Sequence, residues 1–142
     1  INIKNKKTLI IGGGNIAYHK IGFLKPYDPR ISILAKEVIP QIKQMGYPWV
    51  EKLYEKNDLE GAFLVYACTN NQILNQQIKT DAEKIGILTN VVDNPPLCDF
   101  ISPAIYKRDI YTISVGSNAQ NVKKAIFIRD KIKEILQDDV FN

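Results

Sequence analysis

The sequence predicts an α/β fold in which a doubly wound parallel sheet is followed by a small C-terminal strand-plus-helix segment. Apolar runs at residues 8–11 and 62–67 lack alternation, as is typical of parallel strands buried on both faces. Helical apolar stripes and short loops separate the predicted strands, as in repeated strand-helix-strand units. After residue 93, prolines interrupt the pattern and a strictly alternating strand follows.

A glycine-rich turn follows the first strand. Gly12, Gly14 and Ala17 fit the dinucleotide-binding pattern Gly-x-Gly-x-x-Ala at the start of a helix. In this pattern Gly12 allows a tight turn, Gly14 lets the backbone approach a pyrophosphate, and Ala17 lets the helix pack closely on the strand. The helix N-terminus would then face the phosphates. The motif therefore favours a nucleotide site in a Rossmann-like domain over a glycine turn without a ligand.

The first helix and second strand come next. Apolar residues recur at helical spacing over 17–24 until Pro26 ends the helix, and residues 31–35 predict a strand. In NAD-binding domains an acidic residue near the end of this strand holds the adenosine ribose. Glu37 could take this role, while Lys36 could accept a 2′-phosphate, so this site leaves the choice between NAD and NADP open.

The middle of the chain continues the alternation of strands and helices. The predicted elements are a short helix or loop at 40–46, a strand at 49–53, a turn at 58–61, a strand at 62–67, a helix between the capping residues 69–71 and Gly86, and a strand at 87–92.

The last part of the chain predicts a different kind of structure. Residues 111–115 alternate between apolar and polar, as in an antiparallel or edge strand, and a last helix is expected from about Asn118. One strand and one helix are too small to form their own core, so we expect them to pack on a partner subunit. The predicted domains are thus a nucleotide-binding domain at 1–95 and a dimerisation segment at 96–142.

Composition and charge exclude several classes of function. The chain of 142 residues has 19 basic and 15 acidic residues, and the basic residues form no dense tract, so we expect no nucleic-acid partner. No apolar run has membrane-spanning length and residues 1–7 lack an apolar signal core, so we expect no membrane partner and a cytoplasmic protein. Cys68 and Cys98 lack metal-ligand spacing, which predicts two free thiols and no metal site.

Several blocks together resemble the precorrin-2 dehydrogenases, which form the N-terminal part of siroheme synthases. The blocks are residues 12–20, residues 67–71 with Asn75, residues 90–103 and residues 129–132. The resemblance implies NAD-dependent oxidation of precorrin-2 to sirohydrochlorin, iron insertion in some members, and a homodimer built through the segment after the nucleotide domain. It also implies a helical C-terminal region, which this sequence does not show.

The resemblance also assigns residues. Asp93 falls on the catalytic aspartate, and Asn15, Ile16, Lys36 and Glu37 fall on NAD-contacting positions. The candidate cofactor-binding residues are these four together with Gly12 and Gly14 of the glycine turn and with Thr69 and Asn90 of the resembling blocks. Ser117 matches a serine of the substrate loop, although residues 118–122 depart from the family pattern. His19 stands where the family usually has arginine, and we expect it on a helix surface.

The chemistry of the residues supports the same assignment. Asp93 follows a strand's carboxyl end, where a base that accepts the proton of the oxidation would lie, although a turn aspartate is an equally simple interpretation. Asp93 would repel the substrate's carboxylates, so Arg108, Lys123 and Lys124 are expected to bind them. Cys98 and Asp99 would make a poor metal site, and a loop role is the better hypothesis.

Three functional hypotheses remain after this step. The first is a precorrin-2 dehydrogenase, with iron or cobalt chelation as a further activity. The second is a regulatory module that binds NAD without chemistry, and the third is a partner subunit that does not bind substrate.

Overall fold

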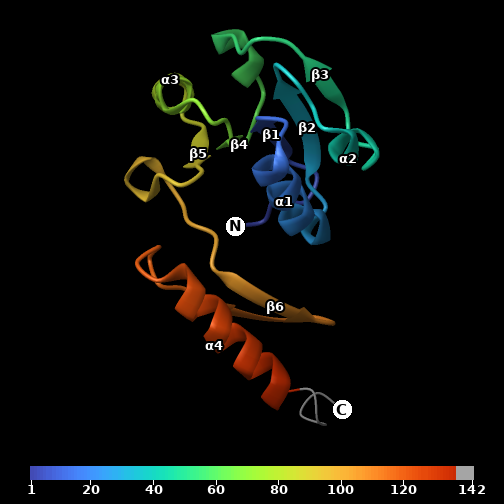
Figure 1. Cartoon of the computed structure of the whole chain (residues 1–142), viewed down its shortest axis with the longest axis vertical. Coiled ribbons are helices and arrows are strands. Elements are labelled where there is room, and N and C mark those ends of the chain that lie inside the picture. Colours follow the sequence, from blue (N-terminus) through green and yellow to red (C-terminus); the bar gives the residue numbers. More distant parts are fainter. Residues whose placement is uncertain (137–142) are drawn as a thin grey trace. The chain divides into compact units, whose positions relative to one another are not determined.

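Five parallel strands form the sheet of the first unit in the computed structural model, which describes residues 1–136. Their spatial order is β3-β2-β1-β4-β5 (Figure 1). The strands are β1 (Lys7–Ile11), β2 (Arg30–Ala35), β3 (Trp49–Glu51), β4 (Leu64–Ala67) and β5 (Leu88–Val91). The predicted parallel sheet is confirmed. The strand order reverses between β1 and β4, which is the switch point where α/β domains bind ligands.

Helices cover both faces of this sheet. The helices of the first unit are α1 (Asn15–Leu24), α2 (Pro40–Lys43) and α3 (Gln72–Lys84), with 3₁₀ turns η1 (Lys25–Tyr27), η2 (Lys56–Leu59) and η3 (Pro95–Leu97). Ile21 of α1 packs in one core cluster with Ile10, whereas Ile78 of α3 packs in a second cluster with Ile11. Because neighbouring residues of β1 point to opposite faces, the two clusters lie on opposite sides of the sheet. The doubly wound prediction is therefore confirmed.

The second unit is a hairpin with one helix. β6 (Ala104–Arg108) pairs antiparallel with β7 (Tyr111–Val115), and α4 (Val122–Ile135) packs against the hairpin (Figure 1). The Arg129 side chain of α4 donates a hydrogen bond of 3.0 Å to the Ile105 carbonyl of β6. The antiparallel character of residues 111–115 is confirmed, whereas β6 was not predicted.

The last helix begins later than predicted. Asn118 and Ala119 have positive φ angles of 50° and 60°, which interrupt a right-handed helix. Asn121 caps α4 instead, because its side-chain oxygen accepts a hydrogen bond of 2.9 Å from the Lys124 N–H. The start expected at about Asn118 is therefore corrected to Val122.

The two compact units divide between Phe100 and Ile101, whereas the predicted domain boundary follows residue 95. The difference arises because the residues after η3 return to β5 and the core. The Asp99 N–H donates to the Thr89 carbonyl at 2.9 Å, and the Phe100 ring lies 5.6 Å from the Tyr66 ring.

Candidate functional site

A cavity of about 800 Å³ lies at the carboxyl ends of β1, β2 and β4. Parallel strands bring these ends to one edge of the sheet, so segments far apart in sequence meet there. Seven of the eight predicted cofactor-binding residues line the cavity: Gly12, Gly14, Asn15, Ile16, Lys36, Glu37 and Thr69. The volume falls within the range of pockets that hold drug-sized and cofactor-sized ligands.

The three glycines of the first turn have three different roles. Gly12 has a φ of 133°, and a Cβ there would lie 2.5 Å from the Cys68 carbonyl oxygen. A Cβ on Gly13 would collide with the Glu37 carbonyl oxygen. Gly14 has open space around it, so a ligand rather than the protein would meet a side chain placed there. The structure thus supports a tight turn at Gly12 and an open approach at Gly14, and it adds Gly13, which the sequence pattern leaves variable.

The start of α1 suits an anion. Gly14 is the N-cap and provides no side-chain hydrogen bond, and the first turn of α1 contains no acidic residue. At the start of α3, in contrast, the Asn71 side chain accepts hydrogen bonds from the Ile73 and Leu74 N–H groups at 3.0 and 3.1 Å. The positive end of the α1 dipole therefore faces the cavity without a side chain of its own chain to neutralise it.

Two lysines and one glutamate stand at the β2 side of the cavity. Lys36 and Glu37 follow β2 and are exposed. Lys52 is held in an ion pair with Asp58, with 2.8 Å between Nζ and Oδ1, and this hydrogen bond raises the pKa of Lys52. Lys36 and Glu37 thus remain the side chains at the position where an adenosine ribose would bind.

Thr69 is tied to the start of α3. Its hydroxyl donates to the Asn75 side-chain oxygen at 2.6 Å and accepts from the Asn71 N–H at 3.2 Å. Asn75 is fully buried and donates back to the Thr69 carbonyl at 2.9 Å. These bonds fix the backbone of the loop after β4, which forms one wall of the cavity.

Asn90 is the predicted cofactor residue that does not line the cavity. Its side chain is buried, and its amide donates a hydrogen bond of 2.9 Å to the Phe100 carbonyl. The amide also lies 3.5 Å from the Cys98 sulfur. In this arrangement Asn90 anchors the segment that returns from η3.

Asp93 is exposed and adopts a left-handed backbone conformation with a φ of 59°. It lies within electrostatic range of Cys68, which lines the cavity. The pKa of Cys68 is raised to about 12, chiefly by burial, while the charge of Lys20 lowers it and the charge of Asp93 adds a smaller increase. Lys20, which was not among the predicted site residues, has its Nζ 5.7 Å from the centre of the Tyr66 ring.

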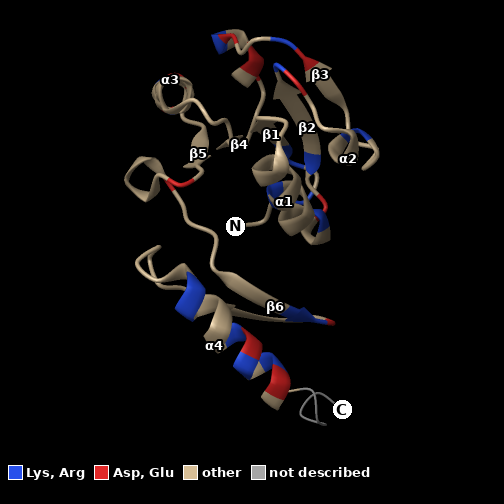
Figure 2. Cartoon of the chain, viewed as in Figure 1, with Lys and Arg blue, Asp and Glu red and all other residues tan. Residues whose placement is uncertain are grey.

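The four predicted substrate-binding residues belong to the second unit, and only Ser117 lines its small cavity of about 80 Å³. The Ser117 hydroxyl accepts a hydrogen bond of 3.2 Å from the Asn121 N–H. Arg108 donates to the Leu136 carbonyl at 3.0 Å, and the Lys124 Nζ lies 4.9 Å from the centre of the Phe127 ring. Lys123 is exposed. Figure 2 shows basic and acidic residues interspersed along α4.

The remaining candidates are placed as follows. His19 is exposed on α1 and its ring lies 5.7 Å from the Tyr18 ring. Cys68 and Cys98 are both free thiols.

Residues 1–136 contain no group of three or more His, Cys, Asp or Glu side chains that could hold a metal ion. Within the same residues, no helix combines the length and the apolar character that a membrane span requires.

A family model and curated proteins match this chain. A family model described as "Putative NAD(P)-binding" matches residues 1–104. A siroheme synthase of Zymomonas mobilis is 35% identical over 139 residues, and one of Baumannia cicadellinicola is 34% identical over 139 residues. Each match covers 95% of this chain and 30% of the other protein. The chain thus spans about 30% of the length of the siroheme synthases it matches.

A solved structure has the same fold. The structure titled "SirC, precorrin-2 dehydrogenase" superposes with a TM-score of 0.81 at 20% identity. The superposition covers 95% of this chain and 68% of that one, so it includes both the parallel sheet and the second unit.

Proposed function

Because the chain belongs to the NAD(P)-binding family of siroheme synthase N-terminal domains, we propose that it oxidises precorrin-2 to sirohydrochlorin with NAD as hydride acceptor. The observation that carries this proposal is the 800 Å³ cavity between the glycine turn and the end of β2. Its open Gly14 and its uncapped helix start suit a pyrophosphate.

Six side chains or backbone groups would hold the cofactor. Gly12 and Gly14 shape the turn, Asn15 and Ile16 open α1, and Lys36 and Glu37 would contact the ribose. Bound NAD supplies the hydride acceptor. Glu37 can accept hydrogen bonds from ribose hydroxyl groups, which is the basis for proposing NAD before NADP.

Asp93 is proposed to accept the proton that leaves precorrin-2 together with the hydride. Its carboxylate is exposed and lies near Cys68, which lines the cofactor cavity. The carboxylates of precorrin-2 would be bound by Arg108, Lys123 and Lys124, with Ser117 as a hydrogen-bonding group. We further propose that the same protein inserts iron or cobalt into sirohydrochlorin, since metal insertion also releases protons that Asp93 could accept.

The deciding experiment measures NAD reduction with precorrin-2 for the parent chain and for Asp93→Asn. The substitution keeps size and most hydrogen bonding but removes the base, so turnover should fall by about 10²–10⁴-fold while NAD affinity is retained. Asp28→Asn is the matched control, because Asp28 is also exposed and also has a positive φ, of 53°.

The other outcomes separate the alternatives. NAD binding without turnover by the parent chain would favour a regulatory module, and binding of neither compound would favour a partner subunit. Normal turnover by Asp93→Asn would place the base elsewhere and leave Asp93 as a turn residue. Sirohydrochlorin supplied with ferrous or cobalt ion tests chelation in a separate reaction.

A further inference from the structure

Asp93 occupies a turn whose backbone needs support. Val91 ends β5, and the Asn94 N–H donates to the Val91 carbonyl at 3.2 Å, which closes a turn with Asp93 inside it. The φ of Asp93 is 59°, a left-handed value that residues other than glycine adopt uncommonly. Contacts outside the turn must therefore favour this conformation.

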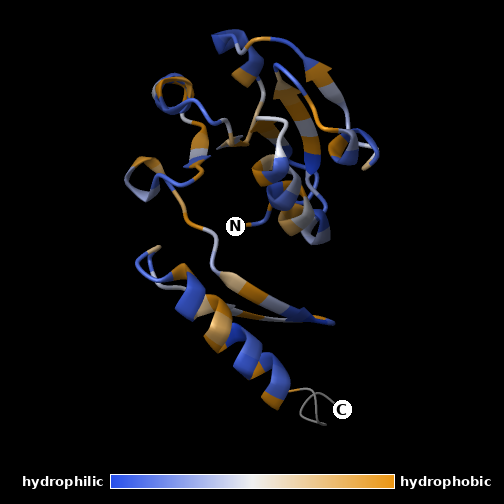
Figure 3. Cartoon of the chain, viewed as in Figure 1, coloured by the Kyte–Doolittle hydropathy of each residue, from blue (hydrophilic) through white to orange (hydrophobic). Residues whose placement is uncertain are grey.

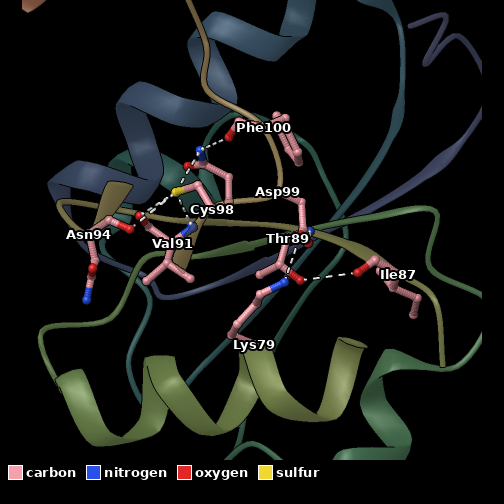
Figure 4. Close-up of polar contacts among 9 residues, drawn as sticks. Lys79, Ile87, Thr89, Val91, Asn94, Cys98, Asp99 and Phe100 are labelled. Carbon is pink, nitrogen blue, oxygen red and sulfur yellow. Dashed lines mark hydrogen bonds and ion pairs between the residues drawn. The ribbon is translucent and has the colours of Figure 1, made fainter. Parts of the chain in front are cut away.

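The Cys98 thiol provides such contacts at both ends of the turn. Its sulfur accepts a hydrogen bond from the Val91 N–H at 3.2 Å and lies 3.1 Å from the Val91 carbonyl, to which the S–H can donate (Figure 4). The Asn94 carbonyl is a second acceptor at 3.5 Å. One half-buried side chain thus joins the residue that enters the turn to the residue that leaves it.

The residue after Cys98 is bound to β5 and α3 by contacts that do not involve the thiol. The Asp99 N–H donates to the Thr89 carbonyl and the Asp99 carboxylate accepts from the Thr89 N–H, both at 2.9 Å. Lys79 of α3 donates to the same carboxylate at 2.6 Å. Because β5 is an edge strand, the two bonds between Thr89 and Asp99 fix this segment along an otherwise unpaired edge, and they do not require Lys79.

We propose that Cys98 is a positioning residue for Asp93, acting through its hydrogen bonds to Val91 and Asn94. The proposal rests on the proposed role of Asp93 as the base. Without the thiol, the Val91 N–H loses its acceptor and the turn can relax from the left-handed conformation. A displacement of a reacting group by about 1 Å can cost about 10²-fold in rate.

The experiment compares Cys98→Ala, Cys98→Ser and Lys79→Met in the full chain. Cys98→Ala should lower kcat by about 10- to 10²-fold with an unchanged KM for NAD, and should shift the pH profile of kcat/KM. Cys98→Ser retains a donor and an acceptor and should recover most of the rate. Lys79→Met is the control for lost stability: it breaks the ion pair with Asp99 but leaves the thiol contacts, so kcat and the pH profile should not change.

A second readout does not depend on turnover. The three-bond coupling between HN and Hα of Asp93, measured by NMR, reports its φ and should change in Cys98→Ala but not in Lys79→Met. An unchanged coupling would overturn the proposal. So would a kcat of Cys98→Ala equal to that of the parent while the kcat of Asp93→Asn is lowered.

Normal turnover by Asp93→Asn would instead refute the role of Asp93 as the base. The coupling would then still decide whether Cys98 holds the turn. If Cys98→Ala does not fold, Cys98→Val fills the space without a hydrogen bond and replaces it.

Discussion

The two units of the chain differ in what they bury. Apart from Ala125, every buried apolar side chain among residues 1–136 belongs to the first unit. In the second unit Ile110, Phe127 and Ile135 remain 86%, 51% and 71% exposed, and Figure 3 shows hydrophobic residues interleaved with hydrophilic ones along α4. The first unit therefore has a core of its own, whereas the second requires a further apolar surface. We propose that a second copy of the chain supplies this surface.

The strongest test of this comparison removes the second unit. A chain that ends at Phe100 should unfold cooperatively, bind NAD as the full chain does, and be monomeric, because the core and the cofactor cavity lie in residues 1–100. The full chain should have the mass of a dimer at the same concentration. Light scattering, thermal unfolding and calorimetric titration with NAD measure the three properties. A shortened chain without a cooperative transition would show that the first unit is not self-sufficient.

The next largest effect is expected at Gly13. The Ile39 N–H donates to the Gly13 carbonyl at 2.9 Å, and a Cβ on Gly13 would collide with the Glu37 carbonyl oxygen. Gly13→Ala should therefore lower the free energy of unfolding by about 2–3 kcal/mol, as overpacking does. Gly22→Ala is the control, since Gly22 lies in α1 with open space and should gain about 0.5–1 kcal/mol. Equal urea midpoints for the two variants would contradict the packing argument.

Gly13 also marks a limit of prediction from sequence. The strands of the first unit, α1 and α3 were predicted because their apolar patterns are local. Seven of the eight candidate cofactor residues line one cavity because parallel strands bring their carboxyl ends together. The need for glycine at position 13 depends instead on a carbonyl that another segment places against it. No local pattern carries this information.

β6 was not predicted, and Asn90 lies outside the cavity that the other candidate cofactor residues line. Both differences depend on contacts with other segments of the chain. Residues Ala104–Arg108 are mostly half-buried and show no clean alternation, so their strand depends on pairing with β7. Asn90 stands near the end of a strand, as a cofactor residue would, but its amide bonds to the Phe100 carbonyl. Its partner comes from residues 96–100, which lie beyond the predicted domain boundary at residue 95.

A smaller effect is expected from a charge on the exposed apolar surface of α4. Ile126 is 41% exposed, so Ile126→Glu should leave the fold of the second unit intact but weaken dimerisation by about 1–3 kcal/mol, the transfer free energy of such a side chain. NAD affinity should not change, because the cofactor cavity lies in the first unit. Sedimentation equilibrium measures the dissociation constant. Lys133→Gln, which changes a polar position of the same helix, is the control, and equal constants for both variants would exclude this part of α4 from the interface.

The smallest expected effect concerns the edge of the sheet in the first unit. Burial by itself would raise the pKa of Asp99, but the hydrogen bonds from Lys79 and from the Thr89 N–H outweigh burial and lower this pKa below its usual value. As pH falls, the unfolded chain therefore binds the proton before the folded one does. The stabilisation is complete above the unfolded pKa of about 3.9 and is lost as pH falls through the lower pKa of the folded state.

Asp99→Asn should remove this pH dependence. The variant keeps an acceptor for the Thr89 N–H but loses the charge that faces Lys79, whose side chain is 11% exposed. At pH 7 its free energy of unfolding should be lower than that of the parent by about 0.5–1 kcal/mol, the size of a partly exposed ion pair. The difference should shrink as pH falls below about 3.9, because the folded parent binds its proton at a lower pH than the unfolded chain does. Urea unfolding between pH 2 and 7 measures both curves, and parallel curves would show that the Lys79 pair does not stabilise the first unit.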